Sequence, residues 1–264
     1  MEQTVQKALN LLEALVKSGQ PRRLTELSRE LGLTKPNVYR LLSTLSILGY
    51  VKKDPATSLY SPTLKLWEMG SLLVRDVDLV AMASPRIKRL SEETRESVQL
   101  AVFDSGFVVY VDKVDSPQPL KAMTNIGSRV PATVTSSGKA LLAWQTPAAL
   151  DQAMAQLKKY TSLTMMRRRD IEQDLEETRK RGYAVNRGEW REGVAGIAAP
   201  IRDRHGHVVA AVAVWGSDRN ILGTERDSFA RMAMSAAHDI SRDLGHLEVA
   251  PAKVRAPQAT AEVA

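Results

Sequence analysis

Apolar residues near the start of the chain recur with the spacing of an amphipathic α-helix, which is predicted to end at Gly19 and Pro21. The positions on its apolar face are Val5, Ala8, Leu9, Leu12, Leu15 and Val16. Thr25 offers an N-cap oxygen for a second helix that runs to about Leu31, where Gly32 breaks it. The chain is therefore expected to begin with a long helix followed by a short one.

A third helix is predicted from Thr34, which can cap it, to about Leu48, with Pro36 in the first turn, where a missing N–H is tolerated. The residues predicted to face inward are Val38, Leu41, Leu42, Leu45 and Leu48. The opposite face carries Pro36, Arg40, Ser43 and Ile47, flanked by Asn37, Tyr39 and Thr44. A short helix, a glycine-containing turn and a helix with an exposed polar strip are typical of a helix-turn-helix.

Two short runs rich in β-formers follow, at residues 50–53 and 59–61, and the turn formers Asp54, Pro55 and Ser58 lie between them. They predict a hairpin that carries Lys52 and Lys53. A helix sized for the major groove, followed by a basic hairpin, predicts a winged helix-turn-helix within residues 1–62. The alternative is a small helical bundle whose hairpin has no part in binding.

Side-chain chemistry assigns DNA-binding roles to eight residues of this region. Arg40 and Asn37 have the fork and amide geometry that reads guanine or adenine edges, and Tyr39, Ser43 and Thr44 can reach bases or phosphates. Lys35, Lys52 and Lys53 suit phosphates, because a point charge carries little sequence information. Residues 1–67 hold ten basic and five acidic side chains, a net +5 of the chain's +7. The partner expected for this region is double-stranded DNA.

Composition limits the class of protein. A length of 264 residues suits two domains, and 44% hydrophobic with 25% charged residues is typical of a folded chain. The absence of Cys excludes disulfides, thiolate metal sites and a Cys nucleophile, and fits the reducing cytoplasm. No signal-peptide pattern and no run of about 18 apolar residues occurs, so neither export nor a membrane partner is expected.

The rest of the chain predicts a linker helix at residues 63–80 and an α+β domain at residues 81–248, with a disordered tail at residues 249–264. The linker helix has apolar residues at helical spacing: Leu64, Leu66, Met69, Leu72 and Leu73. Strands of one antiparallel sheet are predicted at residues 98–103, 107–114 and 208–215. Helices are predicted at residues 85–94, 139–144, 148–157, 171–181 and 225–247.

Several segments, in order and across both domains, resemble the IclR family of bacterial transcription regulators. They are residues 5–9, 11–13, 24–27, 31–42, 48–51, 54–55, 109–114, 127–131, 137–143, 181–185 and 197–200, with Gly193. The resemblance implies a winged helix-turn-helix joined by a linker helix to a GAF-like α/β domain with an antiparallel sheet, which binds a small-molecule effector. It also implies a homodimer, often a dimer of dimers.

Ser136, Ser137 and Gly138 precede a helix expected to begin near Lys139, and a helix N-terminus with two hydroxyls suits a small carboxylate, although plain N-capping is the alternative. In the family this loop contributes to the effector pocket. The resemblance carries the other pocket positions onto Ala122, Val130, Asn186, Gly196, Ala213 and Trp215.

The sequence departs from the family at several of these positions. Thr133 stands where the family often has His, and Gly196 stands where it often has Cys. The acidic run that follows Gly-Tyr in the family is replaced here by residues 186–189, from Asn186 to Glu189. Ala213 and Trp215 replace small polar residues of the family's last strand. The pocket is therefore expected to be less acidic and more apolar. We predict an aromatic or longer-chain carboxylate that packs on Trp215 or Trp190, and the alternative is that both rings fill core.

Two other classes of function remain open at this stage: a DNA-binding architectural protein without an effector, and a small-molecule enzyme tethered to DNA. The run around Gly138 fails as a phosphate loop, since Thr133 and Ala140 stand where Gly and Ser or Thr are required. HExxH, GxSxG and GxGxxG do not occur. His205 and His207 lie in a predicted solvated turn, so no catalytic residue, metal or cofactor is expected.

Overall fold

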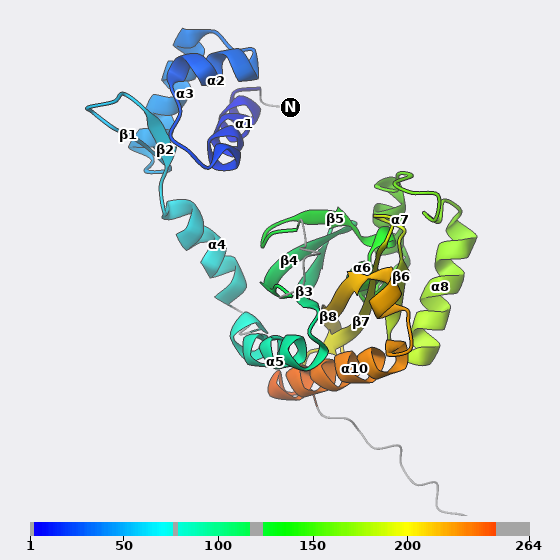
Figure 1. Cartoon of the computed structure of the whole chain (residues 1–264). Coiled ribbons are helices and arrows are strands. Elements are labelled where there is room, and N and C mark those ends of the chain that lie inside the picture. Colours follow the sequence, from blue (N-terminus) through cyan, green and yellow to red (C-terminus); the bar gives the residue numbers. More distant parts are fainter. Residues whose placement is uncertain (1–2, 76–78, 117–123, 247–264) are drawn as a thin grey trace, which may run out of the picture. The chain divides into compact units, whose positions relative to one another are not determined.

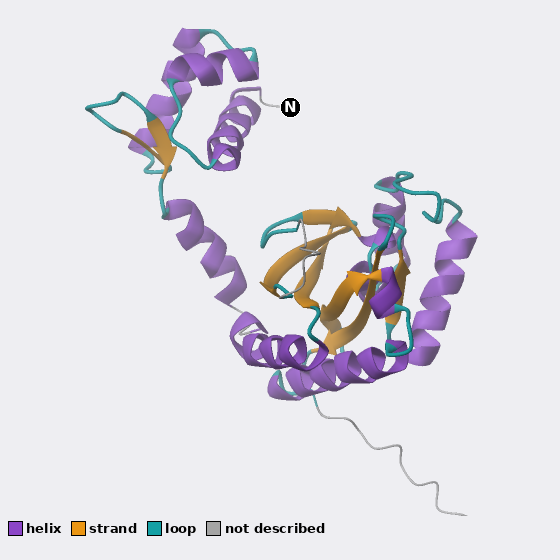
Figure 2. Ribbon diagram, in the orientation of Figure 1, coloured by secondary structure: helices purple, strands orange, loops and turns teal. Residues whose placement is uncertain are grey.

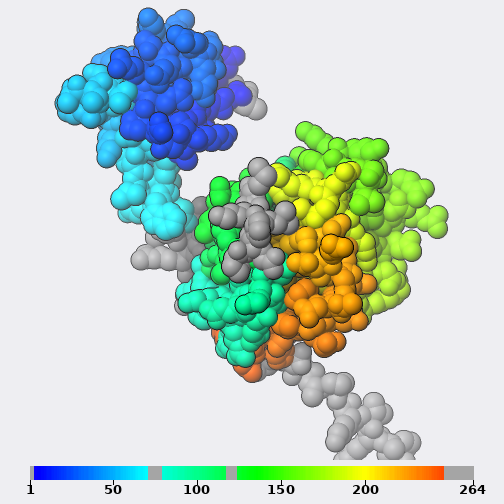
Figure 3. Space-filling view, viewed as in Figure 1, coloured from blue at the N-terminus to red at the C-terminus, as the bar shows by residue number. Residues whose placement is uncertain are grey.

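The structure is a computed structural model that describes residues 3–75, 79–116 and 124–246. Contacts divide the chain into two compact units, Met1–Val77 and Asp78–Ala264 (Figure 1 and Figure 3). The tail predicted to be disordered, residues 249–264, lies outside the described residues, and so does Ala122. No helix of the described ranges is long and apolar enough to cross a bilayer.

The first unit contains the expected helix-turn-helix and wing (Figure 2). Its elements are α1 (Gln3–Ser18), α2 (Leu24–Leu31), α3 (Lys35–Ile47), β1 (Val51–Lys53), β2 (Tyr60–Pro62) and α4 (Lys65–Arg75). β1 and β2 pair antiparallel, with Lys52 opposite Ser61. One core joins the three helices to the wing and consists of Leu11, Ala14, Leu15, Leu27, Val38, Leu42, Leu45, Val51 and Tyr60.

The apolar face predicted for α1 is confirmed only in part. Leu15 is fully buried as predicted, but Val5, Leu9 and Val16 are 50–56% exposed, and Leu11, which was not placed on that face, is fully buried. The helix has apolar residues on two sides, and periodicity does not tell which side packs on α2 and α3. The neighbouring helices also differ from the prediction in two details. Leu48, predicted to face inward from α3, is half exposed. α2 begins at Leu24, before Thr25, and the Glu26 carboxylate accepts the Arg23 N–H at 3.2 Å at its start.

The second unit is built on an antiparallel sheet, which confirms the α+β class. Six described strands lie in the order β5-β4-β3-β8-β7-β6. They are β3 (Ser97–Asp104), β4 (Phe107–Val114), β5 (Arg129–Pro131), β6 (Ala184–Arg187), β7 (Val194–Arg202) and β8 (Val208–Ser217). The sequence analysis missed β5, β6 and β7. β5 and β6 are short. In β7 the β-formers Val194, Ile197 and Ile201 are separated by Gly, Ala and Pro200, which are weak β-formers, so the segment does not stand out as a strand.

Helices cover both faces of this sheet (Figure 1). α5 (Leu79–Thr94) and α10 (Arg226–Asp243) pack on one face, and α6 (Ser136–Leu142) packs on the other, where α8 (Arg168–Arg181) contacts α6. The remaining short elements are η1 (Ala132–Val134), α7 (Pro147–Ala155) and α9 (Asp218–Ile221). Alternate residues of a strand serve opposite faces: Val212 and Val214 join the core under α5 and α10, and Ala211 and Ala213 join the core under α6.

Several helices begin earlier than expected. α5 starts at Leu79 rather than Pro85, because the buried residues Leu79, Ala83, Ile87 and Leu90 continue one face through the proline. α6 starts at Ser136 rather than Lys139, since the Thr135 hydroxyl oxygen accepts the Gly138 N–H at 3.0 Å and so caps the helix three residues earlier.

Candidate DNA interface and ligand cavity

The residues predicted to contact DNA gather on the solvent side of α3. Lys35, Asn37, Tyr39, Arg40 and Thr44 are exposed, and Ser43 is half buried. The reason is local, because Val38, Leu42 and Leu45 bury the opposite face of the helix in the core of the unit. The Thr44 hydroxyl donates to the Arg40 carbonyl oxygen at 3.0 Å, so in this conformation it offers only an acceptor outward.

The wing presents its two lysines on β1. Lys52 and Lys53 are exposed, while Val51 and Tyr60 anchor the hairpin in the core. The Asp54 carboxylate accepts the backbone N–H groups of Ala56 and Thr57 at 2.8 and 3.3 Å, which orders the turn and holds the pKa of Asp54 below its usual range. Both lysines therefore stand on a hairpin with a defined turn.

Arg22, which the sequence analysis left unassigned, is part of the scaffold. Its guanidinium contacts Glu26 at 2.9 Å and Glu30 at 2.8 Å, and its backbone pairs with that of Tyr60 on the wing. These contacts fix α2 to the wing. Three charges near the helix-turn-helix are thus engaged with one another.

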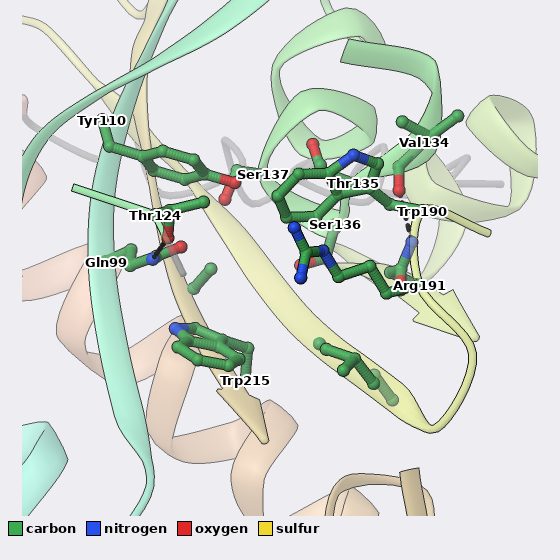
Figure 4. Close-up of a pocket in the computed structure, with 15 residues that line it drawn as sticks. Gln99, Tyr110, Thr124, Val134, Thr135, Ser136, Ser137, Trp190, Arg191 and Trp215 are labelled. Carbon is green, nitrogen blue, oxygen red and sulfur yellow. Dashed lines mark hydrogen bonds between the residues drawn. The ribbon is translucent and has the colours of Figure 1, made fainter. Parts of the chain in front are cut away.

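The second unit contains a cavity of about 150 Å³ on the α6 side of its sheet (Figure 4). Six of the predicted effector residues line it: Ser136, Ser137, Asn186, Gly196, Ala213 and Trp215. Val130 and Gly138 are not among the described lining residues, and Val130 is 3% exposed in the core under α6. Trp190, which the sequence analysis named with Trp215 as a ring on which the ligand packs, also lines the cavity. The lining residues that the sequence analysis did not name are Gln99, Tyr110, Thr124, Val134, Thr135, Arg191, Val194 and Ala195.

Strand register explains why these residues meet. Asn186 lies opposite Gly196, and Gly196 lies opposite Trp215. Gln99 lies opposite Ala213 on the other side of β8. Because side chains alternate, the whole row projects to the face that α6 covers. The polar Gln99, between Val98 and Leu100 in the apolar middle of β3, was the one local signal of this role.

Two glycines create the space at the start of α6. A Cβ on Gly196 would lie 2.7 Å from the Ser136 oxygen, so only glycine lets that hydroxyl sit above β7. A Cβ on Gly138 would lie 2.0 Å from the backbone oxygen of Ala132, a distance that no side chain tolerates. Gly138 therefore serves the close approach of α6 to η1.

The polar groups of the cavity are mostly neutral. The Asn186 amide donates to the Val134 carbonyl oxygen at 2.5 Å, and the Gln99 amide donates to the Thr124 hydroxyl oxygen at 2.6 Å. Burial raises the pKa of the Tyr110 hydroxyl, which keeps it protonated. Arg191 is the one ionisable cation among the described lining residues, and its guanidinium lies 4.7 Å from the centroid of the Trp190 ring.

A buried charge network holds the segment that carries Trp190 and Arg191. Lys139, 1% exposed, contacts Glu189 at 2.5 Å and Asp174 of α8 at 2.9 Å, and donates to the Val185 carbonyl oxygen at 3.1 Å. The Thr161 and Thr164 hydroxyls donate to the carbonyl oxygens of residues 188 and 189 at 2.8 and 2.7 Å. The wall of the cavity is thereby fixed from behind.

A basic helix-turn-helix in one unit and a cavity of this chemistry in the other define a DNA-binding regulator that senses a small molecule. Residues 4–55 match the IclR helix-turn-helix domain, and residues 72–242 match the model described as bacterial transcriptional regulator IclR C-terminal. The chain belongs to the IclR family. It is a DNA-binding transcriptional regulator with a C-terminal effector-binding domain, and this family is regulatory rather than enzymatic.

Named relatives and solved structures agree over nearly the whole chain. The regulator KdgR of Escherichia coli K12 is 33% identical over 247 residues, 92% of this chain and 93% of KdgR. XynR of the same strain is 29% identical, over 92% of this chain and 98% of XynR. The Thermotoga maritima IclR crystal structure covers 93% of this chain and 100% of its own, with 29% identity and a TM-score of 0.76.

A further neighbour is similar in fold alone. It is an IclR homolog from Microbacterium hydrocarbonoxydans, crystallised as a complex with 4-hydroxybenzoate, with 22% identity and a TM-score of 0.78 over 91% of this chain and 98% of its own.

Proposed function

We propose that this regulator recognises operator DNA through α3 and the wing, and that an aromatic carboxylate bound in the cavity modulates this recognition. The observation that carries the ligand class is the cavity itself. Two indoles, Trp190 and Trp215, border it, and Arg191 is the only ionised side chain among its described lining residues. A volume of about 150 Å³ fits a benzene-sized ring, since a cavity of that size holds benzene in another protein.

The lining favours an anion. No carboxylate is present among the described lining residues, so a negatively charged ligand meets no repulsion, and Arg191 supplies a guanidinium that pairs with carboxylate in two parallel hydrogen bonds. The fold neighbour that binds 4-hydroxybenzoate supports the same class. An effector-binding regulator is therefore preferred here to the two alternatives, an architectural DNA-binding protein without an effector and an enzyme tethered to DNA.

The DNA contacts of the proposal follow from side-chain geometry. Arg40 and Asn37 read base edges, Tyr39, Ser43 and Thr44 reach bases or phosphates, and the exposed lysines Lys35, Lys52 and Lys53 bind phosphates. Such a protein acts in the cytoplasm, where its DNA lies.

We infer that the protein acts as a homodimer. Apolar side chains remain exposed in two places on the first unit: Val5, Leu9 and Val16 on α1, and Leu64 just before α4 with Trp67 and Met69 on α4. Leu64 is 82% exposed and Trp67 75% exposed, which is costly in water unless a second copy covers them. Pairing of two dimers stays an expectation from the family.

We propose that effector binding changes the spacing of the two recognition helices of the dimer. This spacing must match DNA half-sites about 34 Å apart, so a change in it alters the affinity for the operator.

The test is a fluorescence anisotropy titration of the full chain against its own upstream intergenic DNA, at two salt concentrations, with Arg40→Ala beside it. We expect salt-sensitive specific binding that Arg40→Ala weakens by about 1–3 kcal/mol, and that an aromatic carboxylate shifts. Lys17→Ala, at an exposed site on α1 that is not among the proposed DNA contacts, is the matched control. Equal affinity for every DNA would contradict the recognition surface, and a response to pyruvate or glyoxylate but to no aromatic acid would contradict the ligand class.

A further inference from the structure

Trp215 presents a buried hydrogen-bond donor that has no partner among the described residues. Its indole lines the cavity, and within the described part of the chain it belongs to neither of the two core clusters of this unit. Trp190, in contrast, lines the cavity and also packs against the core under α6. The alternative that both rings simply fill core therefore does not account for Trp215.

An unpaired buried N–H costs a protein about 1–3 kcal/mol, and native structures leave few of them. A phenylalanine at this position would give a comparable apolar wall without that loss. The donor is therefore useful only when something in the cavity accepts from it.

We propose that the Trp215 N–H selects the ligand by donating a hydrogen bond to a neutral hydroxyl oxygen, so that the effector is a hydroxylated aromatic carboxylate. The inference rests on the proposed function and deepens it. The hydroxyl lies at the Trp215 side of the cavity, and the carboxylate lies toward Arg191.

Strand packing gives the Trp215 side its polar character. Gln99 and Tyr110 stand on β3 and β4, beyond β8, and Gly196 of β7 lies opposite Trp215 without a side chain to cover it. Figure 4 shows Gln99, Thr124 and Tyr110 on the same side of the cavity as the indole of Trp215, and Trp190 and Arg191 on the other side.

The chemistry of these groups distinguishes a hydroxyl from a carboxylate. The Gln99 side-chain amide donates one N–H to the Thr124 hydroxyl oxygen at 2.6 Å, and the carbonyl oxygen of the same side chain is an acceptor. Tyr110 remains protonated and both donates and accepts. A ligand hydroxyl can accept from Trp215 and donate to an oxygen nearby, whereas a carboxylate only accepts. No described lining residue at this end is a cation, and the ammonium of Lys113, opposite Gln99 on β4, is already engaged by Asp115 at 3.0 Å and by the Thr124 carbonyl oxygen at 3.3 Å, so a carboxylate would be buried here without a free counter-charge. The two ends of the cavity therefore suit two different groups of one ligand.

The test compares three ligands of nearly equal size on the full chain by isothermal titration calorimetry: 4-hydroxybenzoate, 4-methylbenzoate and benzoate. In the unmodified protein we expect the hydroxylated acid to bind about 5–150-fold more tightly than the methylated one, the fold-change that corresponds to one satisfied buried donor. In Trp215→Phe this ratio should fall to within about threefold, because the ring stays and the N–H is lost. Trp190→Phe is the matched control: it should weaken all three acids alike and keep the ratio.

The indole N–H resonances of the unmodified protein give a second readout that does not depend on Trp215→Phe folding. The Trp215 signal, assigned by elimination with phenylalanine variants of Trp67, Trp144 and Trp190, should move downfield with 4-hydroxybenzoate and stay in place with 4-methylbenzoate. A selectivity ratio that is unchanged in Trp215→Phe, or a Trp215 signal that responds equally to both acids, overturns the inference and leaves the aromatic carboxylate class standing. Binding of none of the three acids overturns the proposed ligand class, and the inference with it.

Discussion

Replacing Lys139 by methionine tests how the buried charge network supports the cavity. Lys139 and Glu189 are 1% and 5% exposed, and their ion pair spans 2.5 Å. Asp174 keeps a second cation when Lys139 is removed, since Arg181 lies 3.7 Å from its other oxygen. Among the described residues, Glu189 keeps only the backbone N–H of Arg187. The variant therefore leaves one buried carboxylate without a counter-charge.

Removing one partner of a buried ion pair costs about 3–5 kcal/mol. For a unit of this size that loss corresponds to a fall in the unfolding temperature of about 6–20 °C. The double variant, which combines Lys139→Met with Glu189→Gln, removes both charges. It should recover most of the stability, because a buried neutral pair is far less costly than an isolated charge.

The assay is differential scanning calorimetry of the full chain, in which the transition of the first unit is an internal control. Glu13→Ala, which breaks the exposed Lys17–Glu13 pair, should lower the free energy of unfolding of either unit by no more than about 1 kcal/mol. A loss below about 1 kcal/mol in Lys139→Met, or a double variant as unstable as the single one, would refute the reasoning that an uncompensated charge is the cause.

Two further predictions concern the remaining surfaces and charges. Glu96 is 4% exposed, and burial raises the pKa of its carboxyl although the Asn220 amide donates a hydrogen bond to it at 3.1 Å. The protonated carboxyl therefore contributes stability to the folded state at low pH, and this contribution is lost as pH rises through the folded pKa. Glu96→Gln should then raise the unfolding temperature more at about pH 8 than at about pH 4, and an equal rise at both pH values would contradict this account. Trp67→Glu on α4 should weaken the homodimer at least about 100-fold in sedimentation equilibrium by burying a charge in the contact, and an unaltered dimer would move the interface elsewhere.

Local pattern alone identified the winged helix. The helical spacing around Val38 and Leu42, the break at Gly32 and the turn formers after Lys53 each act over a few residues, and the structure contains the corresponding elements. The polar strip of α3 followed directly, because the residues that bury a helix face also define the face that remains outside.

Pairing between distant segments decided the rest. Residues of the cavity come from positions as far apart as Gln99, Trp190 and Trp215, and they meet only through the register of β3, β8 and β7 and the cover of α6. An apolar alternation tells that a strand has two faces but not which strand lies beside it, so Gln99 and Arg191 were missed. The same limit explains why Val5, Leu9 and Val16 of α1 were wrongly predicted to be buried. The sequence by itself determined which elements form in the first unit and which family the chain resembles. Tertiary packing decided which helix and strand faces are buried and which side chains share a cavity, because burial and cavity lining depend on packing partners that local periodicity does not specify.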